Sequence, residues 1–525
     1  MKGAMRAVCA GLSVSVSACP VMAQLATQPS LSTGSAQVAP GDSAGLRAWR
    51  ISPLISVAET YSDNVALAPA NLAKRDWATT VTPGIHAEGS GGRVRGVFDY
   101  RLRSTTYANE SQLNNRQNFL NSRLTAELIE DRFFLETRGS ISQQLRSAFS
   151  AAASDTSVAS SNRVETSVYQ ISPYWRGQIS DIAQFRVRLN LTQSTSRGLA
   201  SSSTTTTEWV GGIRNASPSA KIGWALDGTD LMVNTGVATK SQISRVRGSM
   251  VLEVLPDLHA SVFEGLEATD FPGLSRRSAT TPGFGISWAP SNRTQLAVIR
   301  EKRVFGNAQT VLLAHRTPRI AFRYDDTREI AVASNLIAAT GPGSLNALMA
   351  DLLAANIPDP SQRAQAVNSR LDSQGQGAQG TAQGDFATNQ IFVRRNRQMS
   401  VAAIGPRDTV TLRWGMRDQI AVGSVSSSLD SFAVSPSIRQ QTIDASWMHR
   451  LSPQTSATLS VTRLNAKGLA GSAAQSSQTI LNLLGTRQIG QKTFVSVGAR
   501  RSNFDSSVSG SSRENAILTT LTMRF

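Results

Sequence analysis

Apolar and polar residues alternate along many stretches of about eight to twelve residues, which is the period-2 pattern of β-strands. In residues 184–192, phenylalanine, valine and two leucines share one face, and glutamine, two arginines, asparagine and threonine share the other. The same alternation occurs in 98–103, 120–128 and 319–325. A soluble β-sandwich or β-helix also alternates, but its strands are usually about 5–6 residues long. Long strands with charges at mid-strand favour a barrel with lipid outside and water inside.

The connections between these stretches alternate between short turns and longer polar loops. Gly, Pro, Asp and Asn mark short turns at 88–92, 130–131, 177–181, 227–230, 256–257, 290–292, 317–318, 405–408, 452–453 and 490–491. Longer loops rich in Ser, Thr and Ala include 147–162 and 196–207. Outer-membrane barrels have short periplasmic turns, longer external loops and an even number of strands. The sequence therefore predicts an all-β fold, a transmembrane antiparallel up-and-down β-barrel of about 22 strands (range about 18–22) with a helical extracellular insertion.

Tryptophans lie near the predicted strand ends, as expected for aromatic girdles at the two membrane interfaces. Those at the short-turn side or the first strand are Trp49, Trp175, Trp224, Trp288 and Trp447, and those just after long loops are Trp77 and Trp209. Aromatic residues make up only 6% of the chain, which is few for such a barrel. The girdle prediction therefore depends on their positions rather than on their number.

The last predicted strand alternates up to the terminal residue. Leu521, Met523 and Phe525 share one face with Ile517, and the chain stops on the aromatic residue. This arrangement resembles the C-terminal β-signal that the outer-membrane assembly machinery reads. We therefore expect these residues to serve as the assembly signal.

One long segment, 327–396, does not fit the strand pattern, and turn parity predicts that it is extracellular. Ser344 is placed to cap a helix with Leu345, Leu348, Met349 and Leu352 on one face, and Ser361 to cap a second helix through Leu371. A loop of this length within a compact unit is usually functional or disordered. Two interpretations remain open: a lid or constriction folded over the pore, and a solvated hairpin on the surface.

The N-terminus has the features of a secretory signal peptide. Lys2 and Arg6 precede an apolar stretch over 7–16, and a small-residue cleavage site ends at Ala23. An alternative is a lipoprotein signal with lipidation of Cys19. Residues 1–23 are thus predicted to be a signal peptide, 24–48 a flexible periplasmic lead too short for a plug domain, and 49–525 the barrel.

The chain offers little for catalysis or metal binding. Its two cysteines, Cys9 and Cys19, both lie in the predicted signal region, and the four histidines have no metal-ligand spacing. We find no P-loop, no dinucleotide fingerprint and no GxSxG motif. We expect no enzyme activity, no cofactor and no bound metal.

Charge is the strongest chemical feature. The chain carries 53 Lys and Arg against 36 Asp and Glu, for a net charge of +17. The polar faces of the predicted strands place basic residues in the lumen, namely Arg101, Arg103, Arg123, Arg138, Arg186, Arg188, Arg245, Arg247, Arg319 and Arg323, against the acids Asp99, Glu127, Glu136 and Asp325. A low-dielectric wall lined with one sign of charge concentrates the opposite ion. The arginines either conduct an anionic polymer or solute, or form ion-pair ladders that brace the barrel.

Three short motifs carry a family resemblance. They are Glu59-Thr60-Tyr61-Ser62-Asp63-Asn64, Arg303-Val304-Phe305-Gly306, and Ile357-Pro358-Asp359-Pro360 with Arg363-Ala364. Together they resemble the outer-membrane β-barrel family associated with PEP-CTERM/exosortase systems, over about residues 49–525. Members of that family are found with exopolysaccharide and exosortase genes. The resemblance implies a role in exopolysaccharide export or envelope assembly and supplies no catalytic residue.

These observations predict a protein of the bacterial outer membrane that acts as a channel or export component in exopolysaccharide secretion. The alternatives are a general or anion-selective porin, and a structural barrel that anchors surface polymer or protein. The expected partners are outer-membrane lipid and lipopolysaccharide, the assembly machinery and an anionic polysaccharide. Nucleic acid, the usual partner of a strongly basic protein, is not expected for an exported barrel.

Overall fold

A computed structural model describes residues 49–153, 158–197, 203–216, 221–235, 240–271, 274–332, 349, 386–423 and 430–525. Most of these residues lie in the strands of a single antiparallel sheet. The strands are β1 (Arg50–Ser62), β2 (Asp76–Gly91), β3 (Val94–Tyr107), β4 (Asn115–Ile129), β5 (Phe133–Leu145), β6 (Arg163–Ile179), β7 (Ala183–Ser196), β8 (Ser203–Asn215), β9 (Ile222–Asn234), β10 (Lys240–Leu255), β11 (Leu258–Asp270), β12 (Arg277–Thr280), β13 (Gly283–Ser291), β14 (Thr294–Arg303), β15 (Gly306–Arg316), β16 (Ile320–Ala331), β17 (Phe392–Ile404), β18 (Asp408–Ala421), β19 (Ser437–Ser452), β20 (Thr455–Gly468), β21 (Gln475–Gly490), β22 (Thr493–Ser506) and β23 (Ser512–Arg524).

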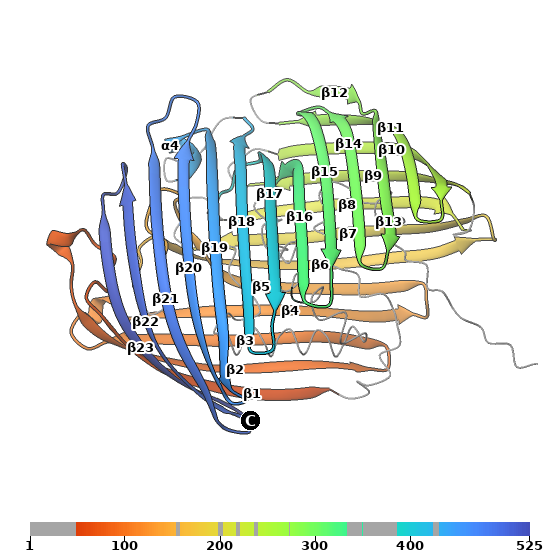
Figure 1. Ribbon diagram of the computed structural model, residues 1–525. Helices are drawn as coiled ribbons and strands as arrows, with labels where there is room; N and C mark the ends of the chain where they lie inside the picture. Colours follow the sequence, from red (N-terminus) through yellow and green to blue (C-terminus); the bar gives the residue numbers. More distant parts are fainter. Residues whose placement is uncertain are drawn as a thin grey trace, which may run out of the picture.

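The sheet closes into a barrel because its first and last strands pair (Figure 1). The register of β1 on β23 runs from Leu54 opposite Arg524 to Ser62 opposite Ala516. The short strand β12 and the strand β13 pair with successive parts of β11, so they occupy one position in the wall. The barrel therefore has 22 strand positions, which confirms the predicted strand count and the antiparallel β-barrel, whereas the predicted helical insertion is not confirmed.

The two faces of the wall differ in the way that the alternation predicts. On β7, Val187 and Leu191 are 44% and 43% exposed, whereas Asn190 and Thr192 are buried. The outward apolar side chains of the last strand, Ile517 to Met523, are exposed in the same way. Because polar side chains with partners face the interior and unpartnered apolar ones face outward, the outer surface suits lipid. The tryptophans follow this rule, since all seven predicted girdle residues are exposed at 40% or more.

Nine of the ten predicted short turns fall between consecutive strands, and one prediction is wrong. The Asp227–Asp230 segment lies inside β9, and the chain turns earlier, between Asn215 and Ile222. An Asp-Gly pair is a strong turn signal. In β9 the Asp227 carboxylate instead faces the interior and pairs with Arg247 at 3.3 Å.

The predicted insertion, 327–396, is shorter than expected because β16 extends to Ala331 and β17 begins at Phe392. The helices predicted from Ser344 and Ser361 lie outside the described residues, apart from Met349, which is helical and buried. The signal peptide and the periplasmic lead, residues 1–48, also lie outside them. A short helix that the sequence pattern did not predict, α4 (Ser431–Val434), follows β18. None of the described helical segments is long and apolar enough to span a membrane.

The apolar cores of the described residues lie where the strands meet the longer loops. The largest core joins Phe149 of the β5–β6 loop, Phe386 and Phe392 near the start of β17, and Phe432 of α4. A second core joins β9 and β10 to the ends of β16 and β17. Since a barrel of this kind has polar side chains along its inner wall, packing of apolar residues at one end indicates that loops fold together there.

Candidate functional site: a basic luminal wall beneath a loop-side cap

Strands β4 to β7 place three arginines around a single carboxylate. The Oε1 atom of Glu136 on β5 lies 3.2 Å from Arg123 Nε and 2.5 Å from Arg138 Nε. Its Oε2 atom lies 3.0 Å from Arg188 Nη1 on β7. Because direct cross-strand neighbours face the same side, the pairing of Arg123 with Arg138 and of Thr125 with Glu136 puts the group on the inner wall. One negative charge cannot neutralise three guanidinium groups, so this cluster is net positive.

Two stacked aromatic rings support the same wall. Phe134 and Tyr174 lie face to face with their ring centroids 4.9 Å apart. The guanidinium carbons of Arg186 and Arg188 lie 5.2 and 5.5 Å from the centroid of the Tyr174 ring. Stacking on an aromatic face holds a guanidinium group without neutralising its charge. The aromatic pair therefore orients two cations of β7 and adds no negative charge.

The basic wall is accessible to water although it faces inward. The Arg123 side chain is 44% exposed, while that of Glu136 is only 5% exposed. Arg186 is exposed as well. A solute inside the barrel would therefore meet the guanidinium groups first, and the carboxylate lies beneath them. This order suits the attraction of anions.

Several luminal arginines of other strands form a different arrangement, in which each pairs with a separate carboxylate. Arg303 and Glu267 pair at 2.6 Å with side chains 2% and 0% exposed, and Arg245 pairs with Glu301. Further pairs are Arg247–Asp227, Arg323–Asp325, Arg394–Glu329 and Arg413–Asp444. These pairs are ladders that brace the wall. The luminal arginines therefore fall into two groups, one that converges on Glu136 and one in separate ion pairs.

The structure places the ten predicted luminal arginines as follows. Arg101, Arg103, Arg123, Arg138, Arg186, Arg188, Arg245, Arg247 and Arg323 lie on strand positions of the inner face. Arg319 does not, because it lies exposed in the turn before β16. Inward acids that the sequence pattern did not predict lie on other strands, among them Glu267, Glu301 and Glu514. Glu267 and Glu301 lie on strands without clear alternation, and Glu514 precedes the alternating stretch 517–525 of the last strand.

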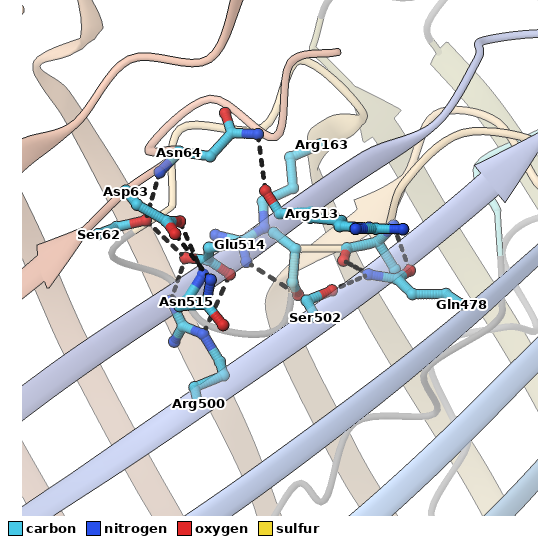
Figure 2. Close-up of polar contacts among 12 residues, drawn as sticks. Ser62, Asp63, Asn64, Arg163, Gln478, Arg500, Ser502, Arg513, Glu514 and Asn515 are labelled. Atoms are coloured by element: carbon cyan, nitrogen blue, oxygen red, sulfur yellow. Dashed lines mark hydrogen bonds and ion pairs between the residues drawn. The ribbon is translucent and has the colours of Figure 1, made fainter. Parts of the chain in front are cut away.

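The seam between β1 and β23 is locked by a buried ion pair on its inner side. Figure 2 shows Glu514 of β23 between Arg500 of β22 and Ser62 of β1. Arg500 Nη2 donates to Glu514 Oε1 at 2.7 Å and Nε donates to Oε2 at 3.2 Å, while Ser62 Oγ donates to Oε1 at 3.0 Å. The two charged side chains are 1% and 0% exposed. This bidentate pair belongs to the closure of the barrel and is not accessible to a solute.

Two motifs behind the family resemblance have structural roles. Asn64, next to the seam in Figure 2, donates through Nδ2 to the carbonyls of Ala68 at 2.7 Å and Arg513 at 2.9 Å. Arg303 belongs to the buried pair with Glu267, and Gly306 has a φ of 101°, which glycine adopts readily. The third motif, around Ile357–Arg363, lies outside the described residues.

The β5–β6 loop runs from β5 toward strands about a third of the circumference away. The Ala152 amide donates to Gln478 Oε1 of β21 at 2.9 Å, and Gln478 Nε2 donates back to the Ala152 carbonyl at 2.7 Å. Ser506 Oγ of β22 donates to the Phe149 carbonyl at 2.8 Å. These contacts tie the loop across part of the mouth.

The segment that leads into β17 crosses from the opposite wall. Phe386 forms an isolated bridge with Leu145 at the end of β5, and the Ala387 amide donates to the Leu145 carbonyl at 2.7 Å. Strands β5 and β17 lie on opposite sides of the closed wall, with β16 and β17 in front of β4 and β5 in Figure 1. We call residues 146–153, 158–162, 386–391 and 430–436 the cap. Its buried core includes Phe149, Phe386 and Phe432.

Three of the four histidines have local partners that the structure describes. His86 lies 3.3 Å from Asp99, His315 lies 2.8 Å from Thr294 Oγ1, and His449 lies 2.8 Å from Asp408. No group of three or more His, Cys, Asp or Glu side chains suited to a metal ion occurs among the described residues.

A closed 22-strand antiparallel barrel with an apolar outer surface and a polar, charged interior defines a transmembrane β-barrel of the bacterial outer-membrane class. Comparison with protein-family models and with curated proteins gives no match. Among solved structures, the chain is similar to the siderophore receptor PirA from Pseudomonas aeruginosa (10% identity, 91% of this chain and 80% of that chain, TM-score 0.43) and to the FrpB iron transporter from Neisseria meningitidis (9%, 90% and 81%, 0.46). It is also similar to OccAB1 of Acinetobacter baumannii (10%, 91% and 97%, 0.33).

Proposed function

We propose that the protein is an outer-membrane channel that favours anions and that its cap gates the loop-side mouth. The observation that carries this proposal is the three-to-one excess of guanidinium groups over carboxylate around Glu136. Arg123 and Arg186 are exposed toward the interior, so their charge acts on a passing solute. A net positive, low-dielectric wall enriches anions. The bracing pairs elsewhere keep the barrel in shape without changing the sign of its field.

For the transported substance we propose an acidic polysaccharide on its way out of the cell, in association with a PEP-CTERM/exosortase system. The resemblance of the chain to that family suggests this substrate class. Guanidinium groups bind carboxylates in a bidentate way, and spaced arginines on β4 to β7 offer repeated contacts to a repeating polymer. A porin for small anions would use the same wall. A polymer anchor is the structural alternative, and the packed core of the cap is the observation that favours it.

The experiment that tests the channel is the reversal potential of refolded protein in planar bilayers under a salt gradient. Arg186→Gln removes an exposed luminal charge that has no described carboxylate partner, and it should reduce anion preference. The matched control is Arg501→Gln, which is also exposed but lies on the outward face of β22 opposite Leu481. Anion preference should also weaken at high salt, because the Debye length falls from about 10 Å at 0.1 M to about 3 Å at 1 M.

Three outcomes separate the candidate functions. Block of the anion current by a polyuronate, but not by neutral dextran, would support the polysaccharide channel. Anion preference without block by the polymer would support a porin for small anions instead. Cation selectivity of the wild-type channel at low salt would refute the proposal, and a complete lack of conductance, even after the cap is destabilised, would make the anchor the leading function.

A further inference from the structure

The outer face of β11–β14 carries two opposite charges that have no partner within the described chain. Glu264 lies in β11 between Val262 and Leu266, which are 61% and 66% exposed on the outer surface. Arg300 lies in β14 opposite Phe284, which is 50% exposed on the same surface. Both charged side chains are exposed. Neither forms an ion pair or a side-chain hydrogen bond with any residue that the structure describes.

These two charges lie at one height, inside the apolar surface. Each is six positions beyond the first residue of its strand, Leu258 in β11 and Thr294 in β14, and both strands begin directly after a short turn. Strands rise about 3.4 Å per residue and tilt by about 40°, so both charges lie about 15 Å above the short turns. The apolar band of such barrels is about 25 Å tall. Because Trp288 of the girdle is only three positions from the end of β13, the charges lie above the girdle and within the band.

A third charge on the outer face shows how the chain pairs such a residue internally. Asp326 of β16 points outward, opposite Val311 of β15. Its carboxylate accepts from Arg395 at 2.8 Å, and the residue is only 4% exposed. Lipid cannot serve Glu264 or Arg300 in this way, because acyl chains offer neither charge nor hydrogen-bonding groups. The two unpaired charges therefore call for a protein partner.

The positions of the two charges make this face complementary to itself. Strands β12 and β13 share one position in the wall, so β11 and β14 are two positions apart, about 10 Å. A two-fold axis along the membrane normal, in front of β13, exchanges the two charges at equal height. Glu264 of each copy then faces Arg300 of the other, twice in one interface. Gly248, opposite Glu264 on β10, leaves room for a long side chain, since a Cβ added there would meet no atom within 4 Å.

We propose that two copies of this chain form a dimer in the membrane through the outer faces of β11–β14, with Glu264 of each copy paired to Arg300 of the other. The apolar residues between the two charges, among them Phe284 and Ile286, pack against their own counterparts near the axis. Mutual pairing offsets the cost of placing these charges in hydrocarbon, and the low dielectric strengthens each pair. The dimer is independent of the proposed transport function, because its contacts lie on the lipid-facing side of the wall.

The first test exchanges the two charges in the refolded protein. The mass of the protein in detergent micelles is measured by light scattering after size-exclusion chromatography, over a range of protein concentrations. E264R and R300E should each raise the dissociation constant of the dimer by about a hundredfold or more, since each leaves like charges facing one another. The double variant E264R/R300E should restore the dimer. The control R463E reverses an exposed outward charge on β20, away from this face, and should leave the dimer unchanged.

The second test places a cysteine near the axis. The chain beyond Cys19 contains no cysteine, so a single introduced thiol can form a disulfide only between copies. Oxidation of membranes that contain I286C should yield a covalent dimer. The control is I443C on β19, because Ile443 is 44% exposed on the outer surface and Ile286 is 45% exposed. I443C should remain monomeric under the same oxidation.

A wild-type protein that is monomeric in micelles at every concentration, together with an I286C variant that does not cross-link in membranes, would overturn the proposal. A dimer that survives both E264R and R300E would also overturn it, as would a folded double variant that stays monomeric, because the charges would then not form the interface. Cross-linking of I286C to a different protein instead of a second copy would assign this face to another partner and would likewise refute the dimer. Heat-modifiable migration shows that each variant is folded. E264Q and R300Q, which should both weaken the dimer, replace the reversed variants if those do not fold.

Discussion

Phe149 is the best place to test whether the cap is a gate. Its side chain is completely buried, and it packs with Phe432, Phe392 and Ile438 from three other parts of the chain. Replacing a buried phenylalanine with alanine costs about 3–5 kcal/mol. Because the ring packs between the cap and the wall, most of this cost falls on the closed state of the cap. Each 1.4 kcal/mol is a factor of ten, so the ratio of closed to open cap should fall by about a hundredfold to a few thousandfold.

The assay for Phe149→Ala is single-channel recording in planar bilayers, with limited proteolysis of the 146–162 loop in parallel. Openings should become more frequent and longer, and the loop should be cut faster, while the barrel keeps its heat-modifiable migration. The matched control is Phe284→Ala, which removes the same ring from the outward face, where it is 50% exposed. The idea of a gate would be refuted if Phe149→Ala left conductance and protease resistance unchanged in a folded protein.

Three further predictions follow from the fold, the topology and the cap. Deletion of Phe525, whose amide donates to the Pro53 carbonyl at 2.9 Å, should lower outer-membrane abundance, and normal abundance with normal heat-modifiable migration would contradict this. A protease site inserted at Gly377 should be cut in intact cells and one at Ser291 protected; the reverse result would invert the topology. Burial raises the pKa of the Asp430 carboxyl above its ordinary value of 3.8, so the closed cap should gain stability as pH falls through the raised pKa, a gain complete below 3.8. Channel openings should accordingly become rarer from pH 7 toward pH 4, and Asp430→Asn should flatten this dependence; more frequent openings at low pH would contradict it.

Alternation predicted the wall of the barrel because a strand between lipid and water must place apolar and polar residues on opposite faces. This constraint is local, so residues 184–192 alone were enough to predict the strand β7 and its two faces. The turn predicted at Asp227 was wrong because a luminal aspartate followed by glycine has the same sequence as a tight turn. The assignment of Arg319 to the lumen was wrong because alternation does not show where a strand begins or ends.

The cap could not be predicted, since its structure depends on contacts between distant parts of the chain. Phe149 lies in a loop of Ser and Ala without periodicity, and its partners come from the start of β17 and from α4. The bonds between Gln478 of β21 and Ala152 of the loop join residues far apart in the chain, and no local pattern indicates them. The cluster around Glu136 was foreseen in part: its arginines were assigned to the lumen, but their convergence on one carboxylate depends on the register between β4 and β7.

The pairing of β1 with β23 makes insertion of this barrel an all-or-none event. Ser56 and Thr522 bond across that seam although they are 466 positions apart in the chain. Until the last strand arrives, both β1 and the newest strand present a row of unpaired N–H and C=O groups. In the hydrocarbon layer, each such group costs several kcal/mol, and no edge of this kind survives there. Any fragment that lacks strands from either end should therefore remain outside the bilayer core, however well its remaining hairpins pair.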